Sequence, residues 1–292
     1  MRARLSPANL DALSPAEAYV ALVRRFPWMG KHADLLREAL AWQECLQPRP
    51  NFYFRWHLPR LLWTIRMLQS CIQPAMEILD IAAYFPYSTF MERRCGGKWM
   101  RTTFEGGSQL LQDRHEKTMV PSIQLDCDVD PWPVRSQSYD LAMITEVIEH
   151  LHQHPQHALS EINRVLKPGG LLLLTTPNVT SFKKLILLSE GNWGYDSPTF
   201  GNSWGHRYEF SYYQMRECLR ASGFEPVRLE NQDVYIDDPH GLAVEFELLW
   251  ILAGMVLSGK AKPAVRFYLR RGSGLFFLAR KIGDPGSTRI AI

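Results

Sequence analysis

Residues 139–178 show how apolar and polar positions alternate along this chain. Residues 140–144 form a short apolar run of strand character that ends in a polar cluster at 145–150. Apolar residues then recur at helical spacing from 155 to 166, and the letters KPGG that follow are typical of a helix end. Four consecutive leucines at 171–174 predict a strand buried on both faces. Together these segments predict one parallel strand-helix-strand unit.

The same patterns assign elements to the rest of the chain. Ser14, Pro15 and Glu17 have the form of a capping box with proline at the first helical position. Ser211 is in turn the expected N-cap of a later helix. We expect helices at 14–25, 32–46, 59–71, 182–188 and 212–221. Buried strands are expected at 77–83, 98–104, 123–127, 227–230 and 274–280. The strand at 227–230 could extend as far as Tyr235.

Composition places the chain among ordinary soluble globular proteins. It has 292 residues, of which 46% are hydrophobic and 22% charged, with a formal net charge of +3. Five scattered cysteines without a CxxC pair favour free thiols in a reducing cytosol over a disulfide framework or zinc. No apolar segment opens the chain, and the apolar stretch at 242–257 is shorter than a membrane-spanning helix needs. We therefore expect a cytoplasmic protein, with a place at the surface of the inner membrane as the alternative.

Three neighbouring motifs carry a family resemblance. The letters EVIEHL at 146–151, RVLKPGG at 164–170 and LLLLTTPN at 171–178 resemble the second half of a class I S-adenosylmethionine-dependent methyltransferase. The resemblance extends from about residue 78 to residue 224. It implies an α/β fold with a Rossmann-like, seven-stranded, mostly parallel sheet whose last strand is antiparallel. It also implies a methyltransferase enzyme that uses S-adenosylmethionine as its cofactor.

The domain organisation follows from placing these elements on that fold. Residues 1–70 would be an N-terminal helical segment on the lid or acceptor side, and residues 71–292 the methyltransferase domain. Within that domain, residues 179–210 would form an active-site loop, because long loops in compact domains usually serve function. Residues 236–272 would be a helical insert before the last strand.

The first strand should carry the loop that holds the methionine part of the cofactor. The family usually shows Asp-x-Gly-x-Gly here, because glycines let the backbone approach the ligand. In this chain Asp80 is followed by Ala82, Ala83 and Tyr84, without glycine. Two interpretations remain open: a modified loop that still binds the cofactor, and a non-catalytic descendant that has lost it.

Four further residues match cofactor-binding positions of the family. Glu105, at the tip of the second strand, fits the carboxylate that binds the ribose hydroxyls. Asp126 falls where the family binds the adenine amino group, and Cys127 follows it. Thr145 closes the strand that begins the central unit. A solvated turn is the alternative role for Asp126.

The polar cluster after the central strand predicts the chemistry. Glu146, Glu149 and His150 stand at i, i+3 and i+4, so a single helical turn would place them on one face. With His206 from the long loop they could hold a divalent cation, and this set is similar to the metal site of methyltransferases that modify the 2′-hydroxyl of small RNAs. Magnesium or manganese suits such a site, with zinc or iron also compatible.

Two other roles remain open for this cluster. His150 or His206 could act as a general base without metal. Alternatively, Glu146 and Glu149 could cap helices while His150 satisfies a buried hydrogen bond.

The acceptor is inferred from resemblance alone. The motif TTPN, a long loop rich in glycine, asparagine and aromatic residues, and HRYEFS at 206–211 look like bacterial methyltransferases of polysaccharide or glycolipid biosynthesis. The expected activity is O-methylation of a saccharide, a glycolipid or another vicinal diol. The alternatives are a methyltransferase of the terminal 2′-hydroxyl of RNA and a methyltransferase-like binding protein.

The expected partners follow from the same residues. The partner would be a small-molecule or glycan acceptor, since the chain shows no concentrated basic face for nucleic acid. Residues 242–271 could contact a membrane surface, although packing against the sheet or a second subunit is the favoured role. The sequence leaves the oligomeric state unknown.

Overall fold

The computed structural model describes residues 6–46, 52–104, 107–112, 117–129, 131–153, 155–189, 191, 205–235, 250, 253–254, 257–259 and 272–286. The chain divides into two compact units. The first comprises Met1–Met143, Val165–Gly170 and Val234–Asp237, and the second comprises Ile144–Arg164, Leu171–Asp233 and Asp238–Ile292. Most of the predicted helical insert at 236–272 lies outside the described residues.

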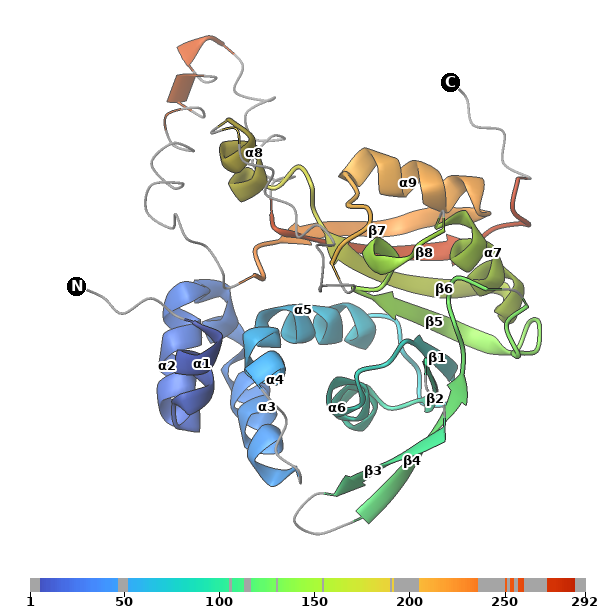
Figure 1. The fold of residues 1–292 in the computed structure, drawn as a ribbon, viewed down its shortest axis with the longest axis horizontal. Coiled ribbons are helices and arrows are strands. Elements are labelled where there is room, and N and C mark those ends of the chain that lie inside the picture. Colours follow the sequence, from blue (N-terminus) through green and yellow to red (C-terminus); the bar gives the residue numbers. More distant parts are fainter. Residues whose placement is uncertain are drawn as a thin grey trace. The chain divides into compact units, whose positions relative to one another are not determined.

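The first unit begins with helices, three of which lie close to the predicted ranges 14–25, 32–46 and 59–71 (Figure 1). The capping box of Ser14 and Glu17 forms as expected and starts the second of them. The helices are α1 (Pro7–Ala12), α2 (Pro15–Arg25), η1 (Pro27–His32), α3 (Ala33–Cys45), α4 (Phe52–Trp56), α5 (Leu58–Gln69) and α6 (Phe85–Cys95). Their buried faces are rich in leucine, so hydrophobic burial stabilises this group.

The strands of the first unit are ordered β3-β4-β2-β1-β5. Here β1 (Glu77–Ile81) pairs with β2 (Lys98–Thr103) in parallel, and β2 pairs with β4 (Lys117–Gln124) in parallel. The hairpin partner β3 (Gly107–Gln112) is antiparallel to β4 and adds a strand that the sequence did not predict. The last strand of this order, β5 (Tyr139–Thr145), is apolar and buried from Leu141 to Ile144.

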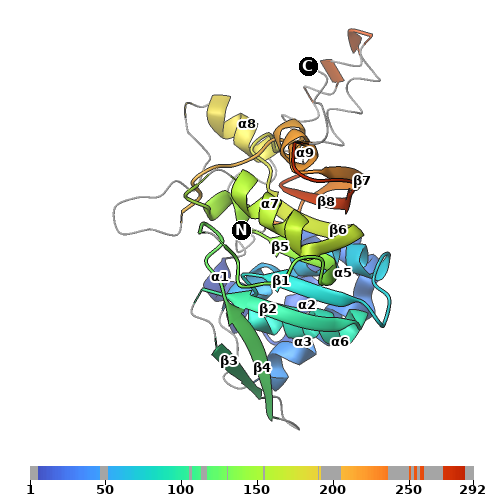
Figure 2. The same ribbon diagram turned by 90° about the vertical axis from the view of Figure 1, so that its right-hand side faces the viewer.

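The second unit contains a further set of antiparallel strands (Figure 2). Its strands are ordered β6-β8-β7, where β6 (Leu166–Pro177) and β7 (Phe224–Gln232) both run antiparallel to β8 (Gly274–Lys281). The helices are η2 (Ile148–His150), α7 (Gln156–Val165), α8 (Phe182–Ser189) and α9 (Tyr212–Ala221). Ser211 caps α9 as predicted. The parallel pairs and the antiparallel last strand confirm the predicted α/β fold class.

Two strand boundaries differ from the prediction. The third predicted strand, 123–127, is observed as β4 at Lys117–Gln124, because pairing with β3 extends it backwards and it ends before Asp126. The strand predicted at 171–174 begins at Leu166, where the ammonium of Lys167 lies 2.8 Å from a carboxylate oxygen of Asp140. Contacts between segments distant in sequence, which periodicity does not reveal, set both ends.

Candidate functional site

The chain turns sharply where β5 ends. Thr145 is the last residue of the strand, and Glu146 follows it with a φ of 54°, in the left-handed region. The Glu146 amide donates to the carbonyl of Thr175 at 3.0 Å, and the Thr175 hydroxyl donates to the Glu146 carboxylate at 2.8 Å. The prediction that Glu146 shares a helical face with Glu149 and His150 is therefore wrong, because bonds to β6 keep Glu146 outside the helix.

Glu149 is the buried carboxylate of this region. It is 0% exposed, and its Oε2 accepts a hydrogen bond of 3.0 Å from the hydroxyl of Thr176. Its backbone carbonyl accepts from the amides of Arg207 and Tyr208, at 2.7 and 3.1 Å. These two backbone bonds fix the segment that carries His206 against the turn that carries Glu149.

Glu149, His150 and His206 form a compact group of possible metal ligands. One ligand atom from each of the three lies within 4.8 Å of the others. The two imidazole rings are 4.8 Å apart between centroids and inclined at 74°, and His150 Nε2 lies 4.0 Å from Glu149 Oε1. Within the described part of the chain, the buried Nδ1 of His150 has no hydrogen-bond partner. The structure thus brings together three of the four predicted ligands, and the carboxylate of Glu146 bonds Thr175 instead.

The sequence patterns assign no role to two residues of this region. The carboxylate of Glu209 is 0% exposed and lies 2.6 Å from His206 Nδ1, and its other oxygen forms an ion pair with Lys184 of α8. The spacing of three residues between His206 and Glu209 was the available signal. Lys184 gave none, because its contact depends on how α8 packs.

The predicted cofactor loop lies in the first unit. Asp80, at the end of β1, is buried, and this burial raises its pKa from 3.8 to about 6 against the opposing effects of Ser88 and Arg101. Ala82 has a φ of 53°, a conformation usually taken by glycine. The amide of Ala82 donates to the hydroxyl of Thr102 at 3.0 Å, and the amide of Ala83 to the carbonyl of Thr102 at 2.9 Å. The loop therefore makes a glycine-like turn without glycine.

Tyr84 connects this turn to α6. It is the N-cap residue of that helix, without a capping side-chain bond, and its ring lies 5.0 Å from that of Tyr53 and 5.2 Å from that of Tyr87. Burial is the main cause that raises the pKa of Tyr84 to about 12, so its hydroxyl stays protonated at neutral pH. Aromatic packing thus holds the start of α6.

The remaining predicted cofactor residues follow β2, β4 and β5. Asp126 lies just after β4, and its Oδ1 accepts a 2.9 Å hydrogen bond from the amide of Asp128. Cys127 is buried, and this burial is the main cause that raises the pKa of its thiol to about 12. The thiolate that a nucleophile needs is therefore disfavoured. Glu105 lies outside the described residues, and Thr145 belongs to the second unit, as the end of β5.

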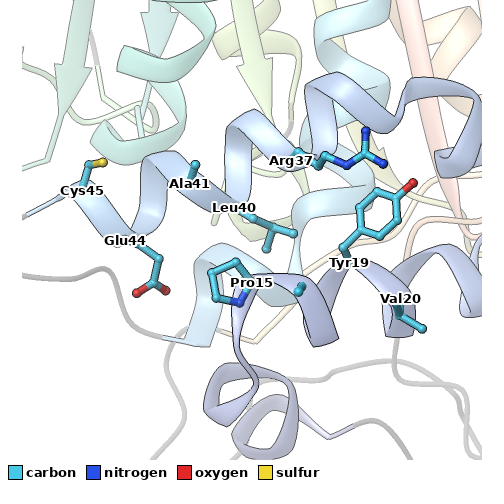
Figure 3. Close-up of a pocket in the computed structure, with 9 residues that line it drawn as sticks. Pro15, Tyr19, Val20, Arg37, Leu40, Ala41, Glu44 and Cys45 are labelled. Carbon is cyan, nitrogen blue, oxygen red and sulfur yellow. The ribbon is translucent and has the colours of Figure 1, made fainter.

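A separate groove of about 750 Å³ opens between α2 and α3 (Figure 3). Its walls are mostly apolar, and the guanidinium of Arg37 lies 4.8 Å above the ring centre of Tyr19. None of the predicted catalytic or cofactor residues lines this groove.

Comparison with known proteins finds a similarity over about half of the chain. The family model described as "Methyltransferase domain" matches residues 89–229. These residues are therefore similar in sequence to a methyltransferase domain. The matched segment contains Glu149, His150 and His206, and it starts after the loop at Asp80.

Curated relatives support the same relationship over shorter stretches. A probable S-adenosylmethionine-dependent methyltransferase of Mycolicibacterium smegmatis is 36% identical over 93 residues, which cover 32% of this chain and 31% of the relative. The ubiquinone/menaquinone biosynthesis C-methyltransferase UbiE of Bordetella parapertussis is 30% identical over 112 residues, or 36% of this chain and 42% of the relative. The chain thus spans about a third to two fifths of the length of these relatives.

Solved structures of methyltransferases are also similar. One is a SAM-dependent methyltransferase from Archaeoglobus fulgidus, with 15% identity and a TM-score of 0.49, covering 76% of this chain and 94% of that one. Within the described residues, no helix combines the length and the apolar character needed to cross a membrane.

Proposed function

We propose that this protein is an S-adenosylmethionine-dependent O-methyltransferase that acts on a saccharide, a glycolipid or another acceptor with vicinal hydroxyls. The single observation that carries the proposal is the group formed by Glu149, His150 and His206 inside the segment that is similar to a methyltransferase domain. A carboxylate and two imidazoles gathered at one turn can bind a divalent cation or accept a proton. Either property assists the attack of a hydroxyl oxygen on a methyl group.

The loop at the end of β1 fits the cofactor despite its composition. Glycines serve in such loops because they adopt positive φ, and Ala82 adopts it here with its amide bonded to Thr102. Asp80 lies near the carboxyl end of β1 and Asp126 follows the carboxyl end of β4, and parallel sheets bind ligands at this edge. These residues would hold the methionine part and the adenine of S-adenosylmethionine, with Glu105 as the ribose carboxylate. The cofactor would supply an electrophilic methyl group bound to sulfur.

The donor set fits a divalent cation. Glu149 contributes an oxygen, and His150 and His206 contribute nitrogens, a combination that suits manganese, iron or zinc and admits magnesium through its carboxylate. The hydroxyl of Thr176 orients the Glu149 carboxylate through Oε2. A cation bound there would lower the pKa of an acceptor hydroxyl.

In the proposed reaction the acceptor oxygen forms a bond to the methyl carbon while the bond from that carbon to sulfur breaks. S-adenosylhomocysteine is released, and the hydroxyl proton passes to a base. The imidazole of His150 or His206 can accept this proton. A metal-free reaction with one of these histidines as base is the closest variant of the proposal.

A carbon acceptor is the second candidate. The Bordetella relative is named as a C-methyltransferase, and a carbon nucleophile next to an enol oxygen would need the same base. Methylation of a terminal RNA ribose and a purely binding role rank below these two candidates.

The test begins with calorimetric titration of the protein with S-adenosylmethionine. Absence of binding at millimolar ligand would leave only the purely binding role. Methyl transfer from labelled cofactor is then measured on glycan, glycolipid, quinone-precursor and RNA acceptors, and the methylated atom is assigned by nuclear magnetic resonance.

The site residues are tested on the acceptor that reacts. Glu149→Gln and His206→Ala should each lower kcat by about 100-fold or more, since each removes a ligand or a base. His157→Ala, on α7, is the matched control and should keep the wild-type rate. A chelator should abolish the rate and manganese should restore it; a rate insensitive to chelation would favour the metal-free base, and unchanged rates in both variants would refute the site.

A further inference from the structure

Glu209 is a buried carboxylate next to the proposed ligand group, and the proposed reaction gives it no role. Its side chain is 0% exposed, and Oε1 lies 2.6 Å from Nδ1 of His206. The neighbouring Phe210 forms an isolated parallel bridge with Asn178, and its carbonyl accepts from the amide of Val179 at 3.1 Å. Glu209 is therefore held in a fixed backbone position beside β6.

A buried carboxylate needs compensation for the hydration that it loses. Lys184 of α8 supplies it, because its ammonium forms an ion pair with Oε2 of Glu209 while His206 contacts Oε1. Both oxygens of Glu209 thus have a positively polarised partner. This arrangement favours the ionised carboxylate, which can only accept hydrogen bonds.

Because Glu209 is the hydrogen-bond acceptor in this contact, it decides which nitrogen of His206 carries the proton. A carboxylate that only accepts requires Nδ1 of His206 to carry the hydrogen, which leaves the lone pair on Nε2. Carboxylates that orient an imidazole in this way raise its basicity and hold its ring in one orientation.

We propose that Glu209 is a positioning residue that holds His206 as the Nδ1–H tautomer, so that Nε2 is the atom presented to the cation or to the acceptor proton. Lys184 supports it by neutralising the second oxygen. This inference deepens the proposed function and rests on it for its catalytic meaning. The tautomer itself does not depend on any ligand.

A purely structural role is the competing explanation. In that case Glu209 would only tie the segment after His206 to α8, and its loss would lower stability without changing the state of the His206 ring. The two explanations differ in three variants: Glu209→Ala, Glu209→Gln and Lys184→Met. Glutamine keeps an acceptor oxygen for Nδ1–H but loses the charge, so it should rescue part of the effect of alanine.

The decisive experiment is nitrogen-15 nuclear magnetic resonance of histidine-labelled full chain, at about pH 9, where imidazole is ordinarily neutral. The His206 signals are assigned with His206→Gln. The wild type should show the Nδ1–H tautomer, Glu209→Gln should retain it, and Glu209→Ala should show a mixture. A wild type with the Nε2–H tautomer overturns the inference, whether or not the protein binds metal.

Titration with manganese alone links the tautomer to the proposed function. Glu209→Ala and Lys184→Met should bind manganese about 10- to 100-fold more weakly than the wild type, and Glu209→Gln should fall between. Glu225→Gln is the matched control, since Glu225 pairs with Arg220 instead. Unaltered affinity in folded Glu209→Ala refutes the positioning role, whereas a wild type that binds no manganese refutes the metal-assisted function and leaves the tautomer result standing.

Discussion

Asp80 shows how burial changes the behaviour of a single residue. It is 2% exposed at the end of an apolar strand, and this burial, which Ser88 and Arg101 offset only in part, raises its pKa from 3.8 to about 6. The folded protein therefore holds the proton to a higher pH than the unfolded chain does. Unfolding releases that proton between about pH 4 and pH 6, so the free energy of unfolding decreases as pH rises through this window.

Substitution of Asp80 by asparagine tests this account. Asp80→Asn removes the titration, so its stability relative to the wild type should increase by about 3 kcal/mol between about pH 4 and pH 7. Urea unfolding of both proteins across this range measures the difference. A flat difference for Asp80→Asn would contradict the assigned pKa.

The turn between β1 and α6 shows how an element compensates for its composition. Ala82 has a positive φ, which costs a non-glycine residue roughly 1 kcal/mol, and two hydrogen bonds to Thr102 hold the turn nonetheless. Ala83 is not among the described residues with positive φ. The two alanines therefore differ in strain although they are adjacent.

Glycine substitutions should separate these two positions. In Ala82→Gly, the relief of backbone strain offsets the larger conformational entropy that glycine loses on folding. The free energy of unfolding of this variant should therefore stay within about 0.5 kcal/mol of the wild type. Ala83→Gly brings only the entropic loss and should cost about 0.5 to 1 kcal/mol. Denaturant unfolding measures both, and equal losses would show that Ala82 is unstrained.

At the scale of the whole molecule, Asn163 joins segments that are far apart in the sequence. It is 1% exposed on α7, and its amide donates to the carbonyls of Ser222 and Gly283, both at 2.9 Å. The ammonium of Lys281 on β8 donates to its backbone carbonyl at 2.6 Å. The close approach leaves no room at Gly223, where a Cβ would lie 2.3 Å from the carbonyl oxygen of Gly283.

Removal of this junction should be costly. Asn163→Ala leaves two carbonyls without their donor and should lower the free energy of unfolding by about 2 kcal/mol. Thermal and urea unfolding measure the loss. Asn9→Ala, at an exposed position of α1, should change stability by less than about 0.5 kcal/mol; similar losses in both variants would deny Asn163 its connecting role.

Prediction from the sequence succeeded where information is local. Capping residues fixed the starts of α2 and α9, and runs of apolar residues located β1, β5 and β8. It failed at β3 and at the start of β4, because these two strands are set by their pairing with each other and not by the periodicity of either segment alone. The motif EVIEHL pointed to Glu149 and His150, which the structure brings together with His206, but it did not reveal the turn at Glu146.

The sequence by itself determined the α/β class, the helix caps and the residue types able to perform the chemistry, since spacing and composition act over a few positions. Tertiary structure alone decided which of these residues meet. Hydrogen bonds to β6 turned Glu146 toward Thr175, backbone bonds to Glu149 brought His206 beside His150, and the packing of α8 provided Lys184 for Glu209. Each contact joins residues far apart along the chain, beyond the reach of any local pattern.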